Sequence, residues 1–95
     1  MISSLQTSIE SSLQKAFSPA RLVVQDDSAQ HAGHAGARPE GGTHFSVAIV
    51  SSQFADKTLM ERHRMVYKTL QPIMKEAGIH ALGIRTWTEE EWNTL

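Results

Sequence analysis

The chain has 95 residues, enough for one small domain with a modest hydrophobic core. Its formal net charge is −1, so no general attraction to nucleic acid or membrane surfaces is expected. It contains no cysteine, which excludes disulfides, thiolate metal ligands and thiol nucleophiles from this chain. No apolar run approaches the roughly 20 residues that a transmembrane helix needs. The N-terminus also lacks signal-peptide and transit-peptide features, so we expect a cytoplasmic protein with no membrane partner.

The first half of the chain predicts one helix and two strands. Apolar residues recur at every fourth position from Leu5 to Phe17, which is typical of an amphipathic helix, and Pro19 ends it. The β-branched segment Arg21–Gln25 predicts a strand, and so does the alternating segment His44–Val50. We expect these two strands to form a hairpin across the long segment between them.

That intervening segment, about residues 26–42, differs in composition from the rest of the chain. It holds four of the six glycines and no large apolar residue. Because nothing in it can fill a core, we expect a flexible surface loop, and loops of this length within a compact domain are often functional.

A second long helix is predicted after this hairpin. A capping box at Thr58 and an apolar stripe from Leu59 to Ala77 define it, and Gly78 occupies the position of a C-terminal glycine. Pro72 removes one backbone donor and is predicted to kink the helix or divide it near Gln71.

The last part of the chain predicts a third strand over His80–Thr86 and a short helix that begins after Thr88 and ends near Trp92. With the long helix divided, the order is α-β-β-α-α-β-α. Since a helix joins the second and third strands, these can be parallel. The prediction is an α+β fold in a single domain over residues 1–95, with a three-stranded mixed sheet and helices on one face.

Three histidines are candidate metal ligands. His31 and His34 are three residues apart in the glycine-rich loop, where they could both reach one metal ion or simply be solvated. His80 precedes the third strand, where a capping or packing role is the alternative. A loop pair with a distant histidine could hold zinc or an iron–sulfur cluster. Because this chain has no sulfur ligand, a cluster would need thiolates from a partner.

Basic residues cluster along the second long helix. Lys57, Arg64, Lys68 and Lys75 are spaced to fall on one side of it, although a kink at Pro72 would turn Lys75 away. The side is either a solvated face or a surface that contacts nucleic-acid phosphates weakly, without base readout. The candidate nucleic-acid-binding residues are Lys57, Arg62, His63, Arg64, Lys68 and Lys75.

No set of residues assembles a nucleophile, a general base and an oxyanion site, so we expect a binding protein and not an enzyme.

Several short motifs then occur in a fixed order over nearly the whole chain. They are Val24–Ser28, His31-Ala-Gly-His34, Thr43-His44-Phe45, Arg62–Tyr67, His80–Ile84 and Glu91-Trp92. From Leu5 to Trp92, this order resembles the BolA family. The resemblance implies an α+β fold similar to the type II KH domain. The GXXG loop of true KH domains is absent, and Phe54-Ala55-Asp56 stands where the family usually has Phe-x-Gly.

The resemblance also implies a function. BolA-like proteins pair with CGFS-type monothiol glutaredoxins and share a 2Fe–2S cluster, for which the partner side supplies a cysteine and glutathione thiolate. The cluster is therefore not bound by this chain alone. The family's ligand histidines would fall on His80 and on the loop, where the spacing favours His31 and His34 competes.

The resemblance implies a role in iron–sulfur homeostasis or redox regulation. Bacterial members are also described as transcriptional regulators that bind DNA, for which Arg62–Lys68 is the natural contact. Zinc held by the three histidines remains an alternative cofactor. Alone, the chain is expected to be a monomer or weak homodimer.

Overall fold

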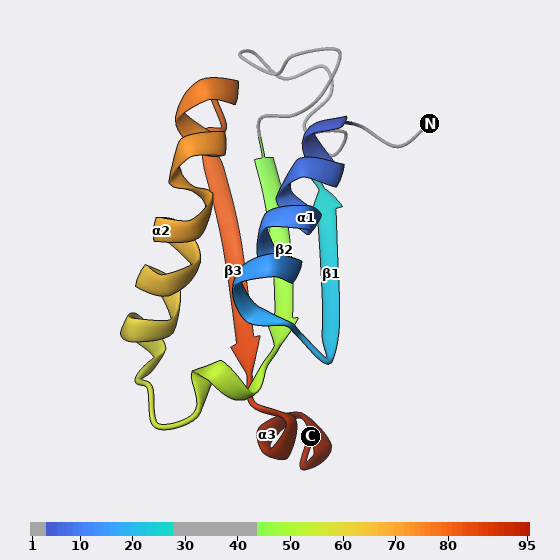
Figure 1. The fold of residues 1–95 in the computed structure, drawn as a ribbon, viewed down its shortest axis with the longest axis vertical. Helices are drawn as coiled ribbons and strands as arrows, with labels where there is room; N and C mark the ends of the chain where they lie inside the picture. Colours follow the sequence, from blue (N-terminus) through green and yellow to red (C-terminus); the bar gives the residue numbers. More distant parts are fainter. Residues whose placement is uncertain (1–3, 28–43) are drawn as a thin grey trace.

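A computed structural model describes residues 4–27 and 44–95. Its elements in chain order are α1 (Ser4–Phe17), β1 (Arg21–Asp26), β2 (His44–Val50), the 3-10 helix η2 (Ser52–Phe54), α2 (Leu59–Ala77), β3 (Ala81–Trp87) and α3 (Glu89–Asn93). Figure 1 shows α1 and α2 on the same face of the sheet and α3 at one end of it. Within the described ranges, no helix is both long and apolar enough to cross a membrane.

The sheet has the predicted mixed topology. Its strands lie in the order β1-β2-β3. Strands β1 and β2 are antiparallel, with Val24 opposite Val47, whereas β2 and β3 are parallel, with Val47 opposite Ile84. Helix α2 supplies the connection between the parallel strands. The predicted α+β fold and hairpin are therefore confirmed.

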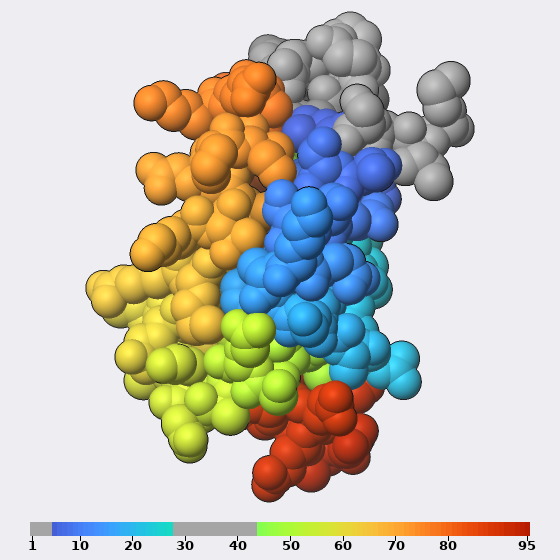
Figure 2. All heavy atoms as spheres, viewed as in Figure 1, coloured from blue at the N-terminus to red at the C-terminus, as the bar shows by residue number. Residues whose placement is uncertain are grey.

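The core lies between the sheet and the two long helices. Alternate residues of each strand point to opposite faces, so one face carries the apolar side chains. The buried cluster includes Ile9, Leu13 and Phe17 from α1, Val66 and Leu70 from α2, and Val24, Phe45, Val47 and Ile49 from the strands. Figure 2 shows α1 and α2 covering this side of the molecule. On the other face, Val23 is 59% exposed.

The short helix α3 does not follow the two long helices onto this face. The rings of Trp92 and Trp87 lie 5.1 Å apart, and the Arg21 guanidinium lies 5.4 Å from the Trp92 ring centre. By strand alternation, Arg21 and Trp87 belong to the face opposite the core. The prediction of helices on one face thus holds for α1 and α2, while the indole of α3 reaches the other face.

Helix α2 runs without interruption through Pro72. The predicted division near Gln71 is wrong, and the long helix is a single element of 19 residues. Both Pro72 and Lys68, whose carbonyl lacks the usual donor from position 72, are exposed. Water can bond that carbonyl, which makes the lost hydrogen bond tolerable. Lys75 therefore stays on the same helix as Lys68.

Gly78 ends α2 in a left-handed conformation, with φ 70° and ψ 40°. The backbone N–H groups of Gly78 and Ile79 both donate to the Met74 carbonyl, at 3.0 and 3.1 Å. This cap turns the chain back toward the sheet, as the glycine's position in the sequence predicts.

Replacing Gly78 by alanine is expected to destabilise the protein by about 1 kcal/mol, because a Cβ is strained at positive φ. No atom lies within 4 Å of the Cβ that would be added, so the effect isolates the backbone conformation. Urea unfolding measures it. Gly83→Ala is the matched control, since its Cβ would meet no atom closer than Ser46 Oγ, at an ordinary 3.5 Å. Equal destabilisation by both substitutions would contradict this account.

Candidate functional site

His80 lies where the chain returns from α2 to the sheet. Ile79 is buried beside the core, and the next residue, His80, is exposed. The strand that follows begins at Ala81 and not at His80, one residue later than predicted. The histidine is therefore held by a capped helix on one side and a paired strand on the other, with its side chain free to meet a ligand.

The two ends of the long loop meet the sheet at this same end. Strand β1 extends to Asp26, one residue beyond its predicted end, and the Asp27 N–H donates to the His44 carbonyl at 2.8 Å. In the parallel pairing, His44 lies opposite Ala81, the residue after His80. Figure 1 shows the end of β1 and the starts of β2 and β3 together at the upper end of the sheet.

A side-chain contact reinforces this anchor. The Ser46 hydroxyl donates to the Asp27 carboxylate, which joins the last described residue before the loop to the second strand. His44, the first residue of β2, is half-buried at this end and adjoins the site.

The predicted loop ligands His31 and His34 lie outside the described residues. They follow Asp27 by four and seven positions in the sequence. At no more than ~3.5 Å per residue, those separations permit spans of about 14 and 25 Å. Chain length therefore allows either histidine to come to the end of the sheet where His80 lies, and it does not choose between them.

The described part of the chain offers a single imidazole of the predicted ligand set, His80. Within residues 4–27 and 44–95, no three histidine, aspartate or glutamate side chains come together in a group that could hold a metal ion. Any metal centre at this end must therefore draw part of its ligand set from residues outside the described ranges or from another molecule. A shared centre fits that donor set, because His80 is exposed.

A second feature is a groove of about 580 Å³ along α2, on the side where Tyr67 reaches β3. Its lining residues are Arg64, Tyr67, Lys68, Gln71, Met74, Lys75 and Ile79. We call it the α2 groove. The Tyr67 hydroxyl donates to the Leu82 carbonyl of β3 at 3.4 Å. The structure thus brings three of the predicted basic residues, Arg64, Lys68 and Lys75, to one surface.

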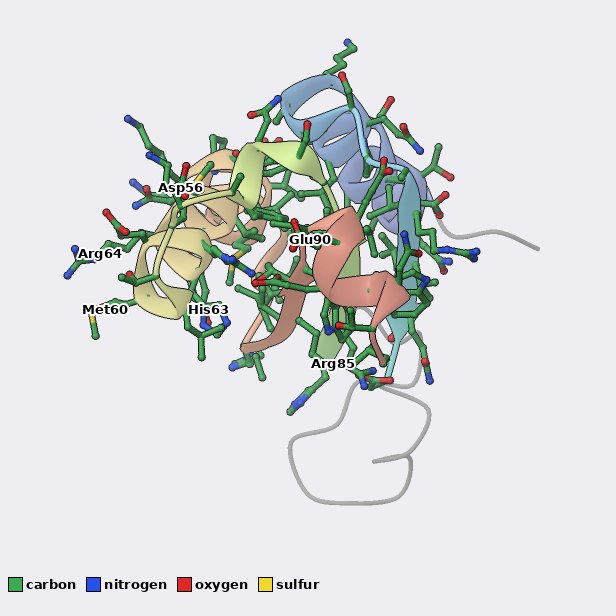
Figure 3. The ribbon with its side chains drawn as sticks, turned by 90° about the horizontal axis from the view of Figure 1, so that it is seen from below. Asp56, Met60, His63, Arg64, Arg85 and Glu90 are labelled. Carbon is green, nitrogen blue, oxygen red and sulfur yellow. The ribbon has the colours of Figure 1, made fainter. Side chains whose placement is uncertain are left out.

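The other predicted nucleic-acid contacts lie apart from this groove. Lys57 is exposed but precedes the N-cap of α2 and is not among the lining residues. His63 is half-buried, and its Nε2 is buried without a hydrogen-bond partner among the described residues. Figure 3 shows Met60 and Arg64 projecting from the outer side of α2, whereas His63 lies on the side nearer β3.

Arg62 is largely buried, and its side chain binds other residues of the fold. Its side chain donates to both carboxylate oxygens of Glu91, at 2.7 and 3.0 Å, and its Nε donates to the Lys57 carbonyl at 3.1 Å. The guanidinium also lies 5.9 Å from the Phe54 ring centre. Arg62 is only 9% exposed and paired with Glu91, so it is far less accessible to a phosphate than the exposed Arg64.

Sequence reasoning missed the Arg62–Glu91 pair, although a signal for it exists. Arg62 lies within the apolar stripe of α2, between Leu59 and Val66. A charged residue at a core-facing position is rare unless it is paired, so its presence there indicates a carboxylate partner elsewhere in the chain. Local pattern alone does not say which carboxylate.

The ion pair shifts the pKa values of both Arg62 and Glu91. Hydrogen bonds from Arg62, followed by the backbone N–H of Thr88, lower the pKa of the Glu91 carboxyl from 4.5 to about 2. The hydrogen bond to Glu91 raises the pKa of Arg62. Ionised Glu91 therefore stabilises the folded chain, and protonation removes that contribution.

The depressed pKa of Glu91 predicts the pH range in which this contribution changes. It is fully present above pH 4.5 and is lost as the pH falls toward about 2. Glu91→Gln should therefore lower the melting temperature at neutral pH, and the difference from wild type should shrink in acid. Thermal unfolding followed by circular dichroism measures this. Glu90→Gln, an exposed neighbour on the same helix, is the control; a pH-independent difference for Glu91→Gln would contradict the assignment.

Comparison with known proteins decides the family. A model of the BolA-like proteins matches residues 13–91. The chain belongs to the BolA-like family. Protein BOLA1, chloroplastic, from Arabidopsis thaliana is 47% identical over 81 residues, covering 83% of this chain and 50% of that protein. The DNA-binding transcriptional regulator BolA of Escherichia coli is 39% identical over 87 residues, covering 92% of this chain and 78% of that protein.

The fold agrees with this family. The solved BolA domain of SufE1 from Arabidopsis thaliana has a TM-score of 0.83 and 42% identity, covering 96% of this chain and 99% of that domain. The chain spans only 23% of the full SufE-like protein 1. Asp56, which stands where the family usually has glycine, adopts φ 63°. As expected for this residue type, the BolA-like chain keeps the left-handed turn without glycine.

Proposed function

We propose that this BolA-like chain acts as the binding partner of a CGFS-type monothiol glutaredoxin. In this proposal the two proteins share a 2Fe–2S cluster. His80 and one loop histidine, His31 or His34, are the ligands from this chain. The glutaredoxin cysteine and glutathione supply the thiolates.

One observation carries the proposal: the parallel pairing of β2 with β3. It sets His44, where the loop returns, opposite Ala81, which follows His80. His44 and His80, which are far apart in the sequence, thereby lie at one end of the sheet. The number of residues between Asp27 and each loop histidine is large enough for that histidine to reach this end. A chain without this crossover would leave the loop and the third strand at unrelated places.

The donor set also supports a shared centre. The chain has no cysteine, and the described residues contribute one exposed imidazole. The bound cluster would supply one-electron redox chemistry, and imidazole ligands raise its potential relative to an all-cysteine cluster. In this proposal the histidines of this chain hold and orient the cluster, and the partner supplies the thiolate ligands.

Anaerobic reconstitution with a monothiol glutaredoxin and glutathione tests the proposal. His80→Ala is expected to abolish the visible absorption and circular dichroism bands specific to the mixed complex, because one cluster ligand is lost. Comparing His31→Ala with His34→Ala identifies the loop ligand as the variant with the same loss.

His63→Gln provides the control, since His63 lies near the start of α2, at the end of the helix opposite His80, and its replacement should leave the spectrum intact. An unchanged spectrum for His80→Ala would contradict the assignment of His80 as a cluster ligand. Stoichiometric zinc in the purified chain without glutaredoxin, lost in the same three variants, would favour the zinc alternative.

Nucleic-acid binding at the α2 groove is the second candidate function. The observation that favours it is the gathering of Arg64, Lys68 and Lys75 around one hollow whose lining contains no carboxylate. The Escherichia coli relative carries the name of a DNA-binding regulator. Phosphate contacts by these three cations would give weak, salt-sensitive binding.

Neutralising the groove should weaken that binding in a characteristic way. Lys68→Gln and Lys75→Gln are each expected to lower affinity for DNA and to reduce the salt slope of the binding constant by about 1. Fluorescence anisotropy across a salt series measures both quantities. Lys57→Gln, outside the groove, should behave as wild type. A salt slope that none of the groove variants changes would rule out this surface.

A further inference from the structure

The α2 groove combines features that a duplex-binding surface does not need. Three cations, Arg64, Lys68 and Lys75, surround it, whereas Met74 and Ile79 give it an apolar floor. The chain as a whole carries a net charge of −1, so this local concentration of positive charge is a property of the groove. A ligand that fills it must be anionic at its edge and apolar where it enters.

Tyr67 lies within the run of these cations. It is 43% exposed, and its hydroxyl bond to the Leu82 carbonyl fixes the position of the ring. Arg64 and Lys68 lie three residues before it and one residue after it on the helix. An exposed aromatic ring flanked by cations is the arrangement on which unpaired bases stack while the backbone phosphates are neutralised.

The length of the groove matches a short strand. From Arg64 to Lys75, eleven residues at 1.5 Å each span ~16 Å of helix axis. The uninterrupted course of α2 through Pro72 keeps Lys75 in this line. A few nucleotides can therefore contact all three cations at once.

Shape distinguishes a single strand from a duplex. Proteins that read a duplex insert a protruding helix or ribbon into its groove. Here the cations surround a hollow, and a duplex resting on them would leave the apolar floor and Tyr67 unfilled. A flat unpaired base can enter. We propose that the α2 groove binds single-stranded nucleic acid in preference to duplex, which rests on the second candidate function above.

An acidic peptide is the competing occupant of a basic groove, and the structure disfavours it. An extended peptide gains affinity by adding to a free sheet edge, and β3 is the edge strand beside the α2 groove. The Tyr67 hydroxyl, however, already occupies the Leu82 carbonyl of that strand. A peptide added to this edge would meet a backbone acceptor that already has a donor.

The test compares three fluorescent probes at low salt: an oligothymidylate of about eight nucleotides, a blunt-ended duplex compared at equal phosphate concentration, and an oligoglutamate of equal charge. The full chain is expected to bind the single strand most tightly. Tyr67→Leu should weaken that binding about tenfold, the loss of one stacked base, and leave duplex binding unchanged. Tyr67→Phe keeps the ring and should retain most of the affinity.

Lys15→Gln, which removes an exposed cation from α1, controls for net charge. Circular dichroism checks that each variant is folded. Equal or tighter duplex binding overturns the single-strand inference and leaves the nucleic-acid candidate standing. Oligoglutamate binding as tight as that of the single strand shows a surface that reads charge alone and overturns the inference as well. No binding of either nucleic acid overturns both.

Discussion

Parallel strands cannot be joined by a tight turn, and this constraint organises the molecule. To pair β3 alongside β2, the chain must return over the whole length of the sheet, and α2 makes that return. One end of α2 therefore lies at the end of the sheet where β2 and β3 begin, and the other lies beside α3. The Gly78 cap delivers His80 at the loop end. The proposed ligand site and the α2 groove are both consequences of this crossover.

At the opposite end, a charge pair fastens the start of α2 to α3. Arg62, from the first turns of α2, binds Glu91 of α3 and the Lys57 carbonyl. Glu91 also accepts from the Thr88 N–H, so a single carboxylate caps α3 and holds α2. Removing one partner would leave a largely buried guanidinium without its counter-ion, which costs more than the pair itself contributes.

Local pattern in the sequence was sufficient for most of the fold. The apolar residues at every fourth position of α1, the alternation in β2 and the capping box at Thr58 each predict an element that the structure contains. These patterns are readable because they depend only on residues close together in the chain. The course of α2 through Pro72 could not be predicted this way. Whether a proline breaks a helix depends on the surroundings of the carbonyl four residues earlier, and exposure is a tertiary property.

The candidate sites show the same division. Spacing identifies the histidines and basic residues, but only the sheet register brings His80 to the loop ends. Likewise, only packing separates buried Arg62 from exposed Arg64, two residues later. The sequence gives the chemical type of each side chain, whereas the fold determines its exposure and its neighbours.

The placement of the indoles has a practical consequence. The chain's two tryptophans touch each other at the α3 end of the sheet. Trp87 is the last residue of β3, seven residues after His80, which is ~23 Å along the strand at 3.3 Å per residue. The intrinsic tryptophan emission of this protein therefore reports on the docking of α3 and is remote from events at the loop end. A ligand arriving at His80 needs its own chromophore to be seen, and an iron–sulfur cluster has one.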